Sequence, residues 1–299
     1  MGELGFLRWI RERVGRRGGR IVVDTGDDAA VLKFGTANVL FKTDGVIDGV
    51  HFDSAIARPE DIGHKAIARC LSDIAAMGGV PSFAVVAMMA PRNSDERYLR
   101  RIYLGMEKTA RAFRTSIVGG DFASHPGKLA ITVALLGEAR GVDPVRRSGA
   151  RPGHVVGVTG PLGGSILGKH LTFTPRVKEG RRLAKLVSAM IDVSDGAATD
   201  LRHLCRESGA GAVLDERRVP VSAAARRLSK RDGRTPLTHA LADGEDYELL
   251  YTATPDRARK IEAAGLGRSI GEIVAAEGLF LRRRDGRLEE LAEKGWEHT

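Results

Sequence analysis

The chain contains 299 residues with a formal net charge of +9; 42% of its residues are hydrophobic and 5% aromatic. This composition excludes wholesale disorder and favours a core of aliphatic side chains and alanine. No apolar stretch reaches the roughly 20 residues that a membrane-spanning helix needs. The two cysteines, Cys70 and Cys205, stand far apart without metal-ligand neighbours, which excludes a disulfide scaffold or a cysteine-ligated metal cluster. We therefore expect a soluble, cytoplasmic protein.

Short apolar runs and amphipathic segments alternate along the chain. The apolar runs predict strands at 20–24, 29–34, 39–43, 83–89, 116–118, 129–136, 155–158, 212–214 and 248–252. Helical spacing predicts helices at 59–77, 95–113, 183–190, 197–208 and 255–264. The helix at 59–77 is the clearest, because Pro59 suits a first turn and Gly78 can supply a left-handed stop. This alternation favours an α/β or α+β architecture over a bundle or a sandwich.

One segment has the composition of a linker. Residues 141–153, GVDPVRRSGARPG, are rich in Pro, Gly and Arg and separate one apolar strand from the next. We therefore expect an N-terminal domain over residues 1–140 and a C-terminal domain over residues 141–299.

Aspartates recur where apolar runs end. They stand beside Gly, Ser or Thr in VVDTGDDAAV, LFKTDG, RCLSDI, IVGGDF, IDVSDG and DGEDYEL, which begin at residues 22, 40, 69, 117, 191 and 243. Each aspartate taken alone is more typical of a turn or a helix cap. Together, carboxylates at one sheet rim would repel one another unless cations lay between them, and oxygen ligands favour Mg²⁺, Mn²⁺ or Ca²⁺. The pattern predicts a site for metal-bridged polyphosphate.

Other catalytic patterns are weak or absent. The segment GGSILGK at 163–169 has the spacing of a phosphate-binding P-loop, but His170 stands where that loop needs Ser or Thr. We expect a tight strand-to-helix connection there, although the residues leave a bound phosphate open. His51 and His125 lie near acidic segments, and each alone is more typical of a structural role than of a catalyst.

These segments, in this order, resemble thiamine-monophosphate kinases, a family within the aminoimidazole-ribonucleotide synthetase superfamily. The matching stretches are GDDAAV, TDGVIDGVHF, KAIARCLSDIAAMGGVP, VGGD, RSGARPG, VTGPLGGS, MIDVSDG, GEDYELLYT and a terminal GW, which begin at residues 26, 43, 65, 118, 147, 158, 190, 244 and 295. They cover nearly the whole chain, and LSDIAAMG and GEDYEL are the most specific among them.

The resemblance implies a fold and an activity. The fold would be a two-domain, PurM-like α/β (α+β) fold, in which the N-terminal domain pairs across a homodimer into a shared β-barrel beside a C-terminal α/β domain. The activity would be ATP-dependent phosphorylation of thiamine monophosphate to thiamine diphosphate. ATP would be the co-substrate, several Mg²⁺ ions would be needed, and neither a membrane nor nucleic acid would be a partner.

By motif position, the resemblance also implies three groups of site residues. The metal ligands would be Asp28, Thr43, Asp44, Asp73, Asp121, Asp192 and Asp195. The ATP contacts would be Gly120, Asp121, Arg147, Ser194 and Tyr103, of which Asp121 and Arg147 would serve catalysis. The contacts to thiamine would be His51, Glu245 and Trp296, although Trp296 is also compatible with a packing role.

The chemistry of this reaction agrees with these residue types. A phosphate monoester is largely dianionic at pH 7, so the acceptor needs no general base. Metal ions and Arg147 would screen the repulsion between two anions and align them, and we expect direct in-line transfer without a phosphoenzyme. Lys42 departs from the family pattern, which has a small hydroxyl residue before Thr-Asp. Its ammonium would replace a weakly held cation, and we expect fewer bound metals.

Two alternatives stay open at this point. The first is another ATP-using enzyme of the superfamily, such as aminoimidazole-ribonucleotide synthetase. The second is a basic nucleic-acid-binding protein, which the net charge and clusters such as Arg226-Arg227 suggest. This second interpretation does not explain the aspartates at the ends of the apolar runs.

Overall fold

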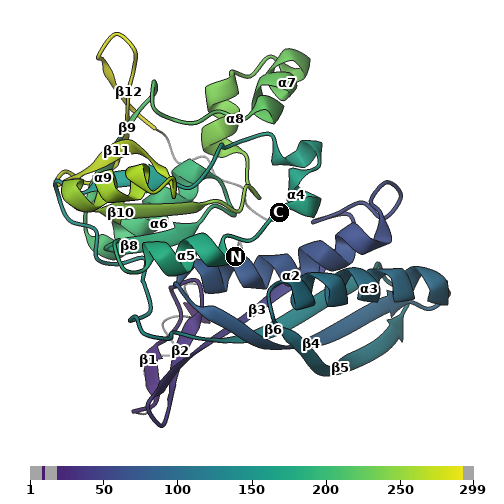
Figure 1. Ribbon diagram of the computed structural model, residues 1–299. Helices are drawn as coiled ribbons and strands as arrows, with labels where there is room; N and C mark the ends of the chain where they lie inside the picture. The colour runs from purple at the N-terminus through teal and green to yellow at the C-terminus, as the bar shows by residue number, and fades with distance from the viewer. Residues whose placement is uncertain (1–8, 11–18, 292–299) are drawn as a thin grey trace.

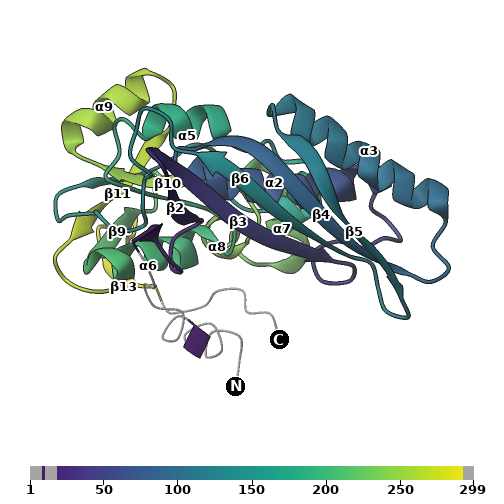
Figure 2. The ribbon, with the colours of Figure 1, turned by 90° about the horizontal axis from the view of Figure 1, so that it is seen from below.

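The computed structural model describes residues 9–10 and 19–291 of the chain. A six-stranded sheet forms the N-terminal half of the protein. The strand order is β1-β2-β3-β6-β4-β5, and neighbours are antiparallel except for the parallel pair β4 and β5. The strands are β1 (Ile21–Val23), β2 (Ala30–Phe34), β3 (Ala37–Ile47), β4 (Val80–Pro91), β5 (Ser116–His125) and β6 (Ala130–Glu138). Figures 1 and 2 show helices α2 (Pro59–Ala76) and α3 (Glu96–Ala112) on one side of this sheet.

Helix α2 is the central helix of the structure. Pro59 occupies the first turn of α2, where backbone N–H groups have no partner within the helix, so the missing N–H of proline costs nothing. The acidic residues Glu60 and Asp61 lie in the same turn and interact favourably with the positive end of the helix dipole. The helices α2 and α3 approach closely, because a Cβ at Gly63 would lie 1.9 Å from the carbonyl oxygen of Ile102. On its other side α2 meets α5 (Val177–Leu183) of the C-terminal half, where a Cβ at Gly180 would lie 2.2 Å from the Ala75 carbonyl oxygen. Side chains of α2 therefore reach the boundary between the two halves.

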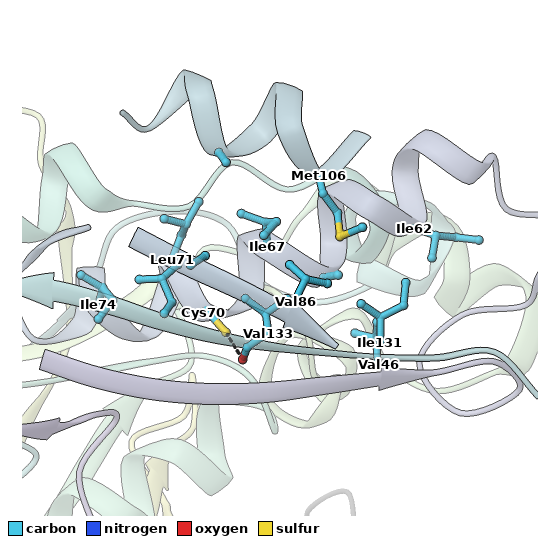
Figure 3. Packing of buried hydrophobic residues seen from close by; sticks show 14 of the residues in the cluster. Val46, Ile62, Ile67, Cys70, Leu71, Ile74, Val86, Met106, Ile131 and Val133 are labelled. Carbon is cyan, nitrogen blue, oxygen red and sulfur yellow. Dashed lines mark hydrogen bonds between the residues drawn. The ribbon is translucent and has the colours of Figure 1, made fainter. Parts of the chain in front are cut away.

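An aliphatic core fills the space between α2, α3 and the first sheet. Figure 3 shows isoleucine and leucine side chains of α2 pointing toward valine and isoleucine side chains of β3, β4 and β6. The Cys70 thiol lies within this core and donates to the carbonyl oxygen of Val133, at 3.5 Å. The core is aliphatic, as the low aromatic content predicts.

A seven-stranded sheet forms the C-terminal half, in the order β13-β12-β9-β11-β7-β10-β8. Its strands are β7 (Val155–Val158), β8 (Ala189–Asp192), β9 (Gly211–Asp215), β10 (Leu249–Ala253), β11 (Arg268–Val274), β12 (Leu279–Arg282) and β13 (Leu288–Glu290). The remaining helices are η1 (Ser165–Leu167), α4 (Lys169–Thr172), α6 (Ala197–Ser208), α7 (Ala223–Asp232), α8 (Pro236–Ala242) and α9 (Pro255–Ala263). Among the described residues, every helix is too short or too polar to cross a membrane.

The architecture is the expected mixed α/β fold with two sheets, but one predicted helix is wrong. The helix predicted at 183–190 is replaced by the end of α5 at Leu183 and by strand β8. Strand β8 pairs with β10, with Met190 opposite Tyr251, so hydrogen bonding to a neighbouring strand overrides the local helical spacing. Helices α7 and α8 and strands β11, β12 and β13 were not predicted. The domain boundary near residue 141 stays a prediction.

Candidate active site

Three buried carboxylates from both halves of the chain converge at one point. Asp28 precedes β2, Asp73 lies on α2, and Asp192 ends β8. An oxygen of each lies within 4.8 Å of an oxygen of the other two, and the three residues are at most 5% exposed. We call these three residues the acidic cluster. It confirms that at least part of the predicted set of aspartates meets in space.

The electrostatics of the acidic cluster favour a bound cation. Burial raises the pKa of Asp192 to about 7, and the neighbouring charge of Asp28 adds to this effect. Burial also raises the pKa of Asp73, while Lys42 opposes the increase. Carboxylates packed this closely ionise together when a divalent cation lies among them, and an all-oxygen donor set suits Mg²⁺. The residues present therefore fit the metal that the sequence predicts.

Two basic side chains already lie beside these carboxylates. The Lys42 ammonium is 2.9 Å from Asp73 Oδ1 and 3.9 Å from Asp44 Oδ2. Lys42 and Asp44 alternate with Thr43 along β3, which directs both toward the α2 side of the sheet. Arg69 Nη2 of α2 lies 3.4 Å from Asp44 Oδ1. Asp44 is therefore close to the acidic cluster and is held by two cations.

Arg147 also borders the acidic cluster, at Asp28. Its backbone N–H donates to Asp27 Oδ1 at 2.6 Å, and its Nη2 donates to Asp28 Oδ1 at 2.6 Å. Burial lowers the pKa of Arg147, but the charge of Asp28 outweighs that effect and raises the pKa overall. Asp27 is a further site residue, and the GDD motif contained the signal for it. The guanidinium is therefore positioned next to the predicted metal ligands.

The loops that follow β8 and precede β10 pack against each other at the acidic cluster. The backbone N–H of Glu245 donates to the Ser194 carbonyl oxygen at 2.7 Å. The N–H groups of Asp195 and Gly196 both donate to Asp200 Oδ2 at 3.1 Å, which fixes the loop after Asp192. Ser194, Asp195 and Glu245 therefore share one neighbourhood.

A second polar group links two of the predicted thiamine contacts. The Lys65 ammonium donates to the His51 carbonyl oxygen at 2.5 Å and lies 2.7 Å from Glu245 Oε1. Lys65 is fully buried, which lowers its pKa. Sequence reasoning missed Lys65, although it begins the matched stretch KAIARCLSDIAAMGGVP. The structure therefore brings His51 and Glu245 together through a third residue.

A buried pair of aromatic rings lies next to Glu245. The Tyr247 hydroxyl donates to Glu245 Oε1 at 3.3 Å, and its ring stacks on Phe173 with 3.8 Å between centroids. Glu245 and Tyr247 both have positive φ angles, of 61° and 51°, which residues other than glycine rarely adopt. Such backbone strain is often kept at functional sites.

Several predicted site residues lie apart from the acidic cluster. The Thr43 hydroxyl is on the opposite side of the sheet from Asp44 and donates to the Val133 carbonyl oxygen at 3.1 Å. Gly120 and Asp121 lie on the exposed edge strand β5, and Tyr103 is 44% exposed on α3. Strand β5 is three strands from β3, or about 14 Å. Trp296 lies outside the described residues.

The glycine-rich segment at 163–169 forms a tight connection, as predicted. The N–H of Gly163 donates to Asp246 Oδ2 at 2.6 Å, and that of Gly164 donates to Asp243 Oδ2 at 2.8 Å. In a P-loop, backbone N–H groups of this kind donate to phosphate. Here they already donate to carboxylates of the protein.

Comparison with known proteins defines the class. Residues 26–139 match the model of the N-terminal domain of AIR synthase related proteins, and residues 150–283 match that of their C-terminal domain. The thiamine-monophosphate kinase of Rhodopirellula baltica is 38% identical, covering 99% of this chain and 97% of the relative. That of Aquifex aeolicus is 31% identical, covering 100% of this chain and 98% of the relative.

The solved structures agree with this class. The structure of AaThiL complexed with AMPPCP and TMP matches with a TM-score of 0.88 and 30% identity, covering 100% of this chain and 97% of that one. A structure of hydrogenase maturation protein HypE in complex with ATP, at 20% identity and a TM-score of 0.74, shares the fold alone. The chain belongs to the thiamine-monophosphate kinase family.

Proposed function

We propose that the chain transfers the γ-phosphoryl group of ATP to thiamine monophosphate and so forms thiamine diphosphate. The observation that carries the proposal is the convergence of Asp28, Asp73 and Asp192 within 4.8 Å in a member of this kinase family. AaThiL, which resembles the chain over its whole length, was solved with AMPPCP and TMP, and this supports a nucleotide and a thiamine phosphate as the two substrates.

The acidic cluster would hold Mg²⁺, with Asp44 and Asp195 at its margin. Bound Mg²⁺ would supply positive charge to the phosphate oxygens during transfer. Lys42 supplies a charge of the same sign from the protein, 2.9 Å from Asp73. We therefore propose that this site binds fewer divalent ions than a site with a hydroxyl residue at position 42.

Arg147 would bind and align the ATP phosphates. A guanidinium can donate two parallel hydrogen bonds to a phosphate. The Arg147 backbone is held by Asp27, and its guanidinium lies beside the acidic cluster through its contact with Asp28. Metal binding at Asp28 would compete with the ion pair at 2.6 Å and release the guanidinium toward ATP. Ser194, in the loop after β8, would contact ATP from the other side.

Glu245 and its neighbours would recognise the thiamine moiety. The thiazolium ring of thiamine carries a positive charge, which a carboxylate held by Lys65 and Tyr247 can balance. The rings of Tyr247 and Phe173 are buried and stacked on each other, and the Tyr247 hydroxyl would hold the Glu245 carboxylate in place. His51 completes this side of the site, and Trp296 stays a prediction.

Direct in-line transfer follows from the chemistry of the acceptor. Its phosphate is largely dianionic at pH 7 and attacks without losing a proton to the protein. Incubation with γ-labelled ATP tests this step. Label should enter thiamine diphosphate when thiamine monophosphate is present, and none should remain on the protein after ATP alone. Covalently retained label would contradict direct transfer.

A homodimer would complete the site. Strand β2 pairs with β3 only as far as Phe41, so residues 42–47 of β3 have no strand on that side among the described residues. Strand β5 is the opposite edge of the same sheet, and the exposed residues Phe83 and Val85 lie on the neighbouring β4. If β5 of a second copy lay beside this part of β3, the two sheets would close into the expected barrel.

This arrangement would explain the position of Asp121. Within one chain Asp121 is about 14 Å from β3, too far to share a metal ion with Asp44. A second copy would bring its own Asp121, with Gly120, to the unpaired part of β3. We propose that Asp121 completes the metal site of the other subunit. In this proposal the N-terminal domain, residues 1–140, forms the dimer, and residues 141–299 form the C-terminal domain.

A further inference from the structure

A cavity that shares no residue with the acidic cluster lies in the C-terminal half. Its volume is about 560 Å³. Four segments form its walls: the end of β7, the turn after β9, the first turn of α7 and the start of β11. Three arginines from three of these segments line it, Arg217, Arg226 and Arg268. We call it the arginine cavity.

The arginines around this cavity have few acidic partners. No carboxylate among the described residues lies within ion-pair distance of Arg226, Arg268 or Arg218, and Arg218 lines an adjoining cavity of about 410 Å³. Arg217 donates to the backbone carbonyl oxygen of Arg284. The three arginines that line the cavity are exposed at its surface. Their like charges repel one another, and a bound anion would relieve that repulsion.

The one acidic residue in the two linings, Glu262, is already engaged. Its carboxylate accepts the Ser269 N–H at 2.7 Å. The hydrogen bonds to Ser269 are the main reason that the pKa of Glu262 is lowered, and Arg218 and Arg268 add to the effect. It therefore offsets only part of the positive charge around it.

The walls of the arginine cavity are held in place by backbone hydrogen bonds. Arg268 begins β11 and pairs with Val158 of β7. The N–H of Leu162 donates to the Pro220 carbonyl oxygen at 2.8 Å, which joins the loop after β7 to the turn that carries Arg217. The Ser222 hydroxyl caps α7 and so fixes the first turn, from which Arg226 extends. These hydrogen bonds fix the backbone from which the three arginine side chains extend.

The geometry points to a small anion that carries a di- or triphosphate chain, and we propose that the arginine cavity binds this class of ligand. Three arginines match the charge of such a chain better than that of a phosphate monoester, and guanidinium groups bind phosphate oxygens in pairs. Buried apolar residues such as Val158 and Val219 line the same cavity and would contact the uncharged part of the ligand. The volume is that of an ordinary small-molecule site.

Isothermal titration in EDTA tests this site separately from the kinase site. Without metal the acidic cluster repels phosphate, whereas the arginine cavity needs no metal. The probes are tripolyphosphate, ADP and thiamine diphosphate, titrated separately. We expect at least one probe to bind the full-length protein, and binding should weaken by about tenfold or more in the double variant Arg226→Gln/Arg268→Gln.

Two further variants control the experiment. Arg227→Gln removes the same charge one residue along α7, outside the lining, and should bind as the unchanged protein does. Arg226→Lys/Arg268→Lys keeps the charge and should recover part of the affinity. Phosphorylation of thiamine monophosphate should proceed at its ordinary rate in all of these variants, so failure here would leave the proposed function intact.

Several results would overturn the proposal. These are binding of none of the probes in EDTA, equal affinity in Arg226→Gln/Arg268→Gln and Arg227→Gln, or loss of the kinase reaction in the double variant. Tight binding of a DNA duplex that is lost in the same double variant would instead assign this surface to nucleic acid.

Discussion

The ammonium of Lys42 lies 2.9 Å from a carboxylate oxygen of Asp73, beside a group of carboxylates that could hold a metal ion. The strand register sets this contact, because Lys42 and Asp44 face the same side of β3 and the Asp73 side chain points toward it from α2. Asp73 and Asp44 together raise the pKa of Lys42 in spite of burial, so the lysine stays charged. The protein thus carries a permanent cation within its proposed metal site.

Replacement of Lys42 should change the number of metal ions. In Lys42→Ser we expect about one additional Mn²⁺ or Mg²⁺ per chain at saturation, because Asp73 loses its fixed partner. Without metal this variant should lose about 1–3 kcal/mol of unfolding free energy, because Asp73 is left without its partner. Equilibrium dialysis and urea denaturation measure the two effects. Lys33→Ser, on the exposed part of β2, is the control. An unchanged metal count would contradict the role of Lys42.

Mixing two inactive variants tests whether Asp121 acts across a dimer. Asp44→Asn and Asp121→Asn should each be nearly inactive. After subunit exchange in an equal mixture, half of the dimers are mixed and each of these has one intact site, so about a quarter of the normal activity should return. No recovery, with exchange verified by mass-tagged subunits, would place both residues in the same chain's site.

Removal of the buried lysine at the thiamine side should affect one substrate selectively. In Lys65→Met, Glu245 loses a partner at 2.7 Å and His51 loses a backbone contact. The KM for thiamine monophosphate should rise about tenfold or more, while the KM for ATP changes little. Lys108→Met, on the exposed side of α3, serves as the control. Equal increases in both KM values would show a general loss of structure instead.

The carboxyl group of Asp246 should make stability depend on pH. Burial raises its pKa to about 7, and Oδ1 has no hydrogen-bond partner among the described residues. The folded state therefore holds this proton more tightly than the unfolded state, whose pKa is near 4. This contribution is complete below about pH 4 and is lost as pH rises through 7.

Urea denaturation at pH 5 and pH 8 checks this sign. The quantity compared is the change in unfolding free energy between pH 5 and pH 8, in the unchanged protein and in Asp246→Asn, which has no ionisable group at this position. On going from pH 5 to pH 8, the unchanged protein should lose about 1–3 kcal/mol more than the variant does. The amide of the variant can still accept the Gly163 N–H. A constant difference between the two proteins across this range would contradict the raised pKa.

The fold could be predicted where local signals agree with tertiary packing. Pro59 and the apolar spacing identified α2 to within a residue or so of its bounds. The strand β8 could not be recognised, because its four residues are all buried and its partner β10 lies about 60 residues further along the chain. A short apolar run of this kind has no periodicity that separates strand from helix.

The site could be predicted as a set of residue types but not as a geometry. The aspartates near the ends of apolar runs, among them Asp28, Asp73 and Asp192, indicated a metal site. In the structure, oxygens of these three side chains lie within 4.8 Å of one another. The contact of Lys65 with Glu245 joins residues 180 positions apart, and no local pattern reveals such a pair. The separation of Asp121 from the cluster likewise depends on strand order, which the sequence does not encode locally. That of Thr43 follows from the alternation of side chains along β3, because Thr43 and Asp44 are consecutive residues of one strand.

The most direct measurement follows ADP and thiamine diphosphate together, with purified protein, ATP and thiamine monophosphate, in the presence and absence of Mg²⁺. We expect the two products in equal amounts with Mg²⁺ and neither in EDTA. Asp192→Asn, which removes a buried ligand of the acidic cluster, should lower the rate by about 100-fold or more while the fold is retained. ADP without thiamine diphosphate, or an unchanged rate in Asp192→Asn, would contradict the account.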